Sequence, residues 1–185
     1  MLNTKFARLS FNTNQWETPS GDLGKSENSA THENQFGFGF EEWLFNPNHK
    51  FKDLNGEEWH FGYIEGLRYH HSIVFPDFSL SLFTINSMTK DRYILGVINE
   101  WRKLTSQESL QICNQNLSVI TEMQNNLSIT NRPVALNQFN IHLNNLNENQ
   151  LFNIKFKIPA DLNLNNFAAN KDHRIYKIHR FKLAN

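Results

Sequence analysis

Two adjacent carboxylates, Glu41 and Glu42, stand in the most aromatic stretch of the chain, residues 36–47. A pair of carboxyl groups is one of the arrangements that supplies a general acid and a general base. Neighbouring residues of a helix point about 100° apart around its axis, so one of the two is expected to face solvent or to cap backbone amides. Structural roles are therefore favoured for both carboxylates.

Other catalytic signatures are missing from the sequence. It contains no His-Glu-x-x-His, Gly-x-Ser-x-Gly or Walker motif. The single cysteine, Cys113, lies on the apolar stripe of a predicted helix, where a structural thiol is favoured over a nucleophile. His60, His70 and His71 have no cysteine or spaced carboxylate to complete a metal site. We predict no catalytic residue, metal or cofactor, and whether the chain is an enzyme stays open.

Residue types that suit nucleic-acid binding are more numerous. Trp16 and Tyr69 are expected in exposed loops, and a loop aromatic beside hydrogen-bonding side chains suits a base taken out of a duplex. The predicted base-binding residues are Trp16, Ser20, Lys25, Ser26, Asn28, Tyr69 and His70. The predicted phosphate-binding residues are Arg8, Asn14, Arg68, Arg174, Lys177 and Arg180. Residues 171–182 form the one basic segment, which equally suits the solvated face of an edge strand.

Length, net charge and apolar runs bound the domain count and the possible contacts with nucleic acid or a membrane. The 185 residues are enough for one domain, 1–185, with one core. The formal net charge is +0, so contact with nucleic acid needs a local patch. No run approaches the 18 or more apolar residues of a membrane span, and we expect a cytoplasmic protein that does not bind membranes.

Hydrophobic spacing predicts an α+β fold. Alternating residues indicate strands at 6–11, 58–65, 80–86, 93–101, 151–158 and 174–183. A polar loop is expected at 16–34, a short helix near 40–45, and a short helix with a loop within 125–149. The Thr105-Ser106-Gln107-Glu108 capping box begins a long amphipathic helix over about 106–125. We expect a curved mixed or antiparallel sheet, or a small open β-barrel, with this helix packed across it.

The first third of the sequence resembles the N-terminal DNA-recognition segment of bacterial proteins related to modification-dependent restriction endonucleases. The resemblance is carried by Arg8, Asn14, Trp16, Pro19-Ser20-Gly21, Lys25, Glu27, His32, Gly37-Phe38-Gly39-Phe40-Glu41-Glu42-Trp43-Leu44-Phe45-Asn46 and Gly62-Tyr63. The strand at 93–98, followed by a capped helix, is similar to PUA-like readers of the EVE, ASCH and SRA type. These resemblances imply a barrel with a pocket for a modified or flipped base. No nuclease motif follows these residues, so the resemblance does not imply that this chain cleaves DNA.

The first hypothesis is a DNA-binding module that recognises a modified (for example methylated) or flipped base within a restriction or antiviral defence system. Its partners would be modified duplex DNA and a nuclease domain or subunit. The alternative is a protein-interaction domain of a defence assembly, and a hydrolase using Glu41 or Glu42 ranks third. Residues 36–47 are expected to anchor the polar loop rather than to form the ligand site.

Overall fold

The computed structural model describes residues 3–53, 55–68, 77–130, 133–146, 150–164, 168–178 and 183–184. Their strands form two open sheets, and within this part of the chain no barrel closes. The first sheet is mixed, with β4 parallel to β1 and antiparallel to β5. Its strands are β1 (Asn3–Leu9), β4 (Phe78–Ile85) and β5 (Arg92–Ile98). The second is antiparallel, in the order β2 (Lys50–Lys52), β3 (Glu58–Gly62), β7 (Ile154–Phe156) and β6 (Trp101–Lys103).

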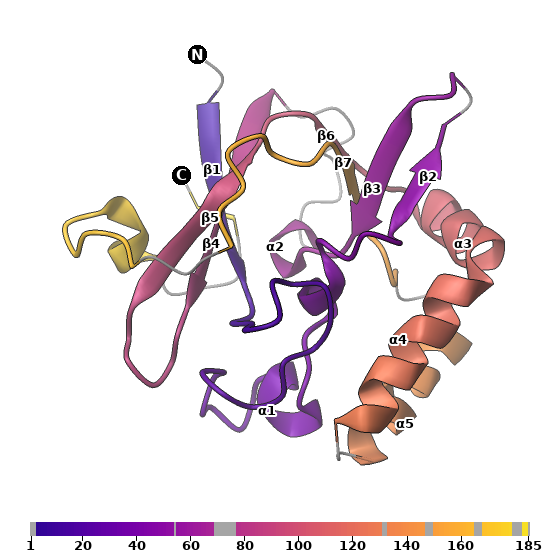
Figure 1. The fold of residues 1–185 in the computed structure, drawn as a ribbon, viewed down its shortest axis with the longest axis horizontal. Helices are drawn as coiled ribbons and strands as arrows, with labels where there is room; N and C mark the ends of the chain where they lie inside the picture. The colour runs from indigo at the N-terminus through magenta and orange to yellow at the C-terminus, as the bar shows by residue number, and fades with distance from the viewer. Residues whose placement is uncertain are drawn as a thin grey trace.

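Helices fill the space beside the sheets (Figure 1). Three short helices follow the N-terminal strand: α1 (His32–Phe36), the 3-10 helix η1 (Phe40–Trp43) and α2 (Glu65–Arg68). Three longer ones lie in the chain between β6 and β7: α3 (Ser106–Gln115), α4 (Leu117–Ile129) and α5 (Pro133–Asn144). A second 3-10 helix, η2 (Arg174–Lys177), lies near the C-terminus. The α+β class is therefore confirmed.

Three apolar clusters hold these elements together. The first joins the two sheets, with Leu80 and Leu82 of β4 and Ile154 and Phe156 of β7. The second packs α3, α4 and α5 against Phe38 and the η1 region. The third covers the other face of the first sheet with η2. Because β4 is covered on both faces, almost its whole length is buried.

The long helix predicted over 106–125 is divided at Asn116. Its start is confirmed, since the Thr105 hydroxyl accepts the Glu108 amide and the Glu108 carboxylate accepts the Thr105 amide. Asn116 has φ −124° and ψ 50°, and its side-chain amide donates to the Ile112 carbonyl. Asparagine competes with helical backbone hydrogen bonds in this way, so α3 ends there and α4 begins at Leu117.

Other boundaries also differ from the sequence-based expectation. The strand predicted over 174–183 is wrong for 174–177, which form η2, and residues 179–182 lie outside the described part. The strand predicted over 93–101 is two strands, β5 and β6, in different sheets. The polar loop ends at α1, and the short helix near 40–45 is η1. No described helix has the length and apolar character needed to span a bilayer.

A buried ion pair fixes η1 to the polar loop. The Glu42 carboxylate accepts four hydrogen bonds, from Lys25 Nζ at 2.6 Å, Gly39 N at 2.8 Å, and Asn12 Nδ2 and Ser20 N at 3.0 Å each. The Lys25 and Glu42 side chains are 2% and 0% exposed. With Lys25 Nζ also donating to the Gly37 carbonyl, residues 36–47 do anchor the loop.

Removing one partner of this pair should destabilise the fold strongly. We expect Lys25→Met to lower the free energy of unfolding by about 3–5 kcal/mol, because Glu42 would remain as an uncompensated buried charge. The double variant Lys25→Met/Glu42→Gln should lose less free energy of unfolding than the sum of the losses in the two single variants. Urea unfolding of the three variants measures this.

The matched control is the exposed pair Lys50–Glu58, whose charged atoms are 3.8 Å apart and whose side chains are each 50% exposed. Lys50→Met should change stability by no more than about 0.5–1 kcal/mol. Similar losses for Lys25→Met and Lys50→Met, or strictly additive costs at Lys25 and Glu42, would contradict the anchoring role.

Candidate functional site

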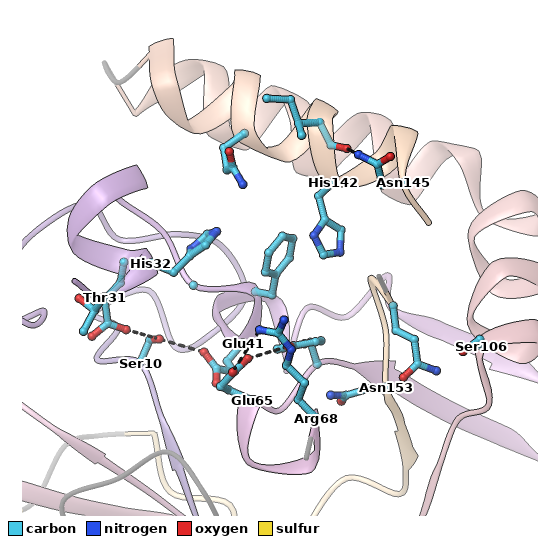
Figure 2. A pocket seen from close by; sticks show the side chains of 17 residues that line it. Ser10, Thr31, His32, Glu41, Glu65, Arg68, Ser106, His142, Asn145 and Asn153 are labelled. Atoms are coloured by element: carbon cyan, nitrogen blue, oxygen red, sulfur yellow. Dashed lines mark hydrogen bonds and ion pairs between the residues drawn. The ribbon is translucent and has the colours of Figure 1, made fainter. Parts of the chain in front are cut away.

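A cavity of about 540 Å³ opens between α1, η1, α2 and α5. Figure 2 shows His142 entering it from α5 and His32 from α1, with Glu41, Glu65 and Arg68 on the opposite wall. This volume lies within the range of small-molecule binding pockets, roughly 300–1,000 Å³. The cavity joins segments that are far apart in the sequence.

One wall of the cavity is aromatic. Phe40 stands at its centre, with ring centroids 4.5 Å from His142, 5.5 Å from His32 and 5.6 Å from Tyr63. Phe139 of α5 lies behind Phe40, with the ring centroids 6.1 Å apart and the ring planes inclined by 29°. Because each ring is held by the others, this wall is preformed and apolar.

The Ser10 hydroxyl links two buried carboxyl groups. Ser10 Oγ is 2.8 Å from Glu33 Oε2 and 2.9 Å from Glu41 Oε2. A hydroxyl has one proton to donate, so both contacts are hydrogen bonds only if one carboxyl is protonated. Burial, and secondarily the nearby Glu65, raises the pKa of Glu41 from 4.5 to about 8. Glu41 therefore donates to Ser10, which donates to Glu33.

Glu41 also joins η1 to α2 and faces a cation. Its Oε1 accepts the Glu65 backbone amide at 3.0 Å. The half-buried Arg8 interacts with the carboxyls of Glu33 and Glu41, which oppose the lowering of the Arg8 pKa by burial. Glu41 is thus held on both oxygens at the cavity wall.

The two histidines present lone pairs rather than protons to the cavity. His32 Nδ1 lies 2.9 Å from the Phe38 carbonyl, which can only accept, so Nδ1 carries the proton and Nε2 does not. Burial lowers the pKa of His32 and of His142, so both rings are neutral at pH 7. A backbone hydrogen bond to Gln150 holds His142, while its Nε2 is buried and has no hydrogen-bond partner.

Glu65 and Arg68 complete the cavity wall on which Glu41 lies. Tyr63 donates its hydroxyl proton to Glu65 Oε2 at 2.6 Å, and Arg68 Nη1 lies 3.6 Å from Glu65 Oε1. Burial raises the pKa of Tyr63, so its hydroxyl keeps the proton that it donates. Arg68 is exposed, with 59% of its side-chain area accessible, and gives the cavity a positive charge at its edge.

The predicted base-binding residues that the structure describes do not line the cavity. The expected exposure of Trp16 is wrong: its ring is 0% exposed, and its Nε1 donates to the Ser10 carbonyl at 3.0 Å. Lys25 is buried against Glu42. Ser20 donates its backbone amide to Glu42, and the Ser26 and Asn28 side chains accept backbone amides within the loop. Tyr69 and His70 lie outside the described residues.

The predicted phosphate-binding residues are dispersed. Arg68 lines the cavity and Arg8 lies beside its carboxyls. Asn14 is exposed but donates to the Pro19 carbonyl within its own turn. Arg174 and Lys177 are exposed on η2, which lies on the far side of the first sheet from α5 (Figure 1). Arg180 lies outside the described residues.

Sequence reasoning overlooked several cavity residues. Glu33, Glu65 and His142 belong to no recognisable chemical motif, and only the fold brings them to the same space. Tyr63, which also lines the cavity, stands out in the sequence only as part of the Gly62-Tyr63 pair of the resemblance. Glu41 was considered, and its position in the dense aromatic stretch was the one signal available. Among the residues described, no group of three or more His, Cys, Asp or Glu side chains is arranged to hold a metal ion.

Comparison of the chain with protein-family models, curated proteins and solved structures gives no match. The chemistry of the site therefore has to be argued from its own geometry.

The protonated Glu41 predicts a pH dependence of stability. Its folded pKa of about 8 lies above its ordinary value of 4.5, so the folded state binds the extra proton between these values. This contribution is fully present below about pH 4.5 and is lost as the pH rises through about 8, at up to about 1.4 kcal/mol per pH unit. Glu41→Gln, which keeps the donor to Ser10 without a charge, should remove it.

Urea unfolding at pH 5, 6, 7 and 8 measures the difference in free energy between the wild type and Glu41→Gln. We expect the wild type to lose stability relative to the variant as the pH rises. A difference that stays constant over this range would show that Glu41 is ionised throughout.

Proposed function

We propose that this chain is a nucleic-acid-binding module that holds a single extruded base in the cavity between α1, η1, α2 and α5. The observation that carries the proposal is the pairing of the Phe40 wall with fixed polar groups opposite it. A flipped base is held by stacking on apolar or aromatic side chains and by hydrogen bonds to its edge. Both kinds of contact are offered here.

The polar groups are held before any ligand arrives. Glu41 is fixed through both oxygens, Glu65 is held by Tyr63, and His32 is held by the Phe38 carbonyl. Preorganised groups lose little conformational entropy on binding, which favours recognition of a small rigid ligand. Arg68 stands at the edge of the cavity, where its guanidinium is within reach of an inserted nucleotide.

The resemblance to restriction-related proteins supports the same proposal. Of the residues that carry it, His32, Glu41 and Tyr63 line the cavity, and Lys25 and Glu42 form the anchor beneath it. We extend the proposal accordingly to a modified base and to a role in restriction or defence together with a nuclease domain or subunit.

A second candidate, docking of a partner protein, is favoured by one observation. Four large apolar side chains of α4 and α5 are exposed: Leu117 at 67%, Ile129 at 75%, Val134 at 43% and Ile141 at 46%. Large apolar side chains that remain exposed are a feature of surfaces that dock a partner protein. Co-purification of a protein with the wild type but not with Ile129→Asp, with DNA binding unchanged, would favour docking.

Arg68 provides the test of the proposed function. Labelled duplexes with and without a modified cytosine or adenine, and with a mismatched base that is easily extruded, are titrated with protein and followed by fluorescence anisotropy. We expect Arg68→Ala to weaken binding roughly tenfold, because a contact at the cavity edge is lost.

Lys177→Ala is the matched control, since it removes an exposed cation on η2, away from the cavity. It should leave the affinity within about twofold of the wild type. Equal losses in both variants would indicate diffuse electrostatic binding. No binding to any of the duplexes would remove the proposal.

A further inference from the structure

Three ionisable side chains that line the cavity use their protons in hydrogen bonds to other atoms of the protein. Glu41 donates to Ser10, Tyr63 donates to Glu65, and His32 donates from Nδ1 to Phe38. What they offer a ligand is therefore lone pairs. The same holds for His142, whose buried Nε2 has no hydrogen-bond partner. A ligand that is complementary to these acceptors supplies the N–H donors itself.

Glu65 and Arg68 determine the order in which hydrogen-bond acceptors and donors face a ligand. Glu65 offers two carboxylate oxygens, and the Arg68 guanidinium stands 3.6 Å from one of them. Figure 2 shows the two side chains next to each other on the wall opposite His142. A carboxylate followed by a guanidinium presents two acceptors and then a donor.

Among the nucleobases, one Watson–Crick edge complements this order. Guanine has two adjacent donors, the N2 amino group and N1–H, followed by the O6 acceptor. Cytosine, adenine and thymine each place a lone pair where guanine has N1–H or the amino group. That lone pair would face a Glu65 oxygen, and a polar group left unpaired in a binding site is strongly rejected.

The aromatic wall fits the same ligand. Phe40 and its neighbours His32, Tyr63 and His142 give the inserted ring apolar faces to contact. Glu41 lies beside Glu65, and its Oε1 accepts the Glu65 backbone amide at 3.0 Å, while its Oε2 contacts Ser10. The carboxyl group that lies next to Arg68 is therefore that of Glu65.

On the premise that the cavity holds an extruded base, we propose that it selects guanine, with Glu65 accepting from N1–H and the N2 amino group and Arg68 donating to O6. The base is identified by this edge, whether it comes from DNA, RNA or a free nucleotide. Glu65 is then the specificity-determining residue of the site.

The test compares guanosine, inosine, adenosine and cytidine 5′-monophosphates by NMR titration of the intact chain. Inosine differs from guanosine only in lacking the N2 amino group, so it isolates one predicted hydrogen bond. We expect guanosine monophosphate to bind at least roughly tenfold more tightly than each of the others. In Glu65→Gln, which keeps one acceptor oxygen, the preference over inosine should fall to within about twofold, while Lys177→Ala should leave it unchanged.

A second arm uses DNA and RNA duplexes that place guanine, adenine, cytosine or thymine (uracil in RNA) opposite an abasic site. Guanine preference in either duplex supports the proposal and identifies its source, and preference among the monophosphates alone assigns the site to free nucleotides. Binding that responds to Arg68→Ala but not to the identity of the base overturns guanine selection and leaves the proposed function standing. Equal or tighter binding of free arginine, which is also rich in N–H donors, overturns it as well.

Discussion

The buried contact between Lys25 and Glu42 is the constraint on which the site depends. It brings donors from Asn12, Ser20, Lys25 and Gly39 to one carboxylate, and so fixes the polar loop against η1. Breaking a buried pair of this kind leaves a charge without compensation. The position of η1, and of every cavity residue on it, follows from this contact.

The neighbouring carboxyl has the opposite environment. A 3-10 helix has three residues per turn, so Glu41 points about 120° away from Glu42, toward the cavity. Glu42 is surrounded by a lysine and three further donors, while Glu41 has Glu33 and Glu65 nearby. Burial raises the pKa of both carboxyls, but Lys25 opposes the rise at Glu42 whereas Glu65 adds to it at Glu41.

Much of the fold was accessible from the sequence, and the failures have local causes. The Thr105 capping box and the strand at Ile154–Phe156 were predicted because short-range patterns determine them. Trp16 was expected at the surface because its neighbours are polar. Gln15 and Trp16 both adopt φ 57°, and the Asn12 side chain accepts the Trp16 amide, so a tight turn directs the ring into the core. A hydrophobicity pattern does not record such a turn.

The cavity could not be predicted from the sequence, for a different reason. Ser10, Glu41 and His142 are separated by 31 and by 101 positions, and their shared chemistry arises only when η1 is fixed against β1 and α5. The residues singled out in the polar loop were the right types for binding, but the anchor uses Lys25 and the Ser20 amide. Since the anchor uses these donors, Arg68 is the cation that lines the cavity. The chemistry of the cavity is in this way a consequence of how the loop beneath it is held.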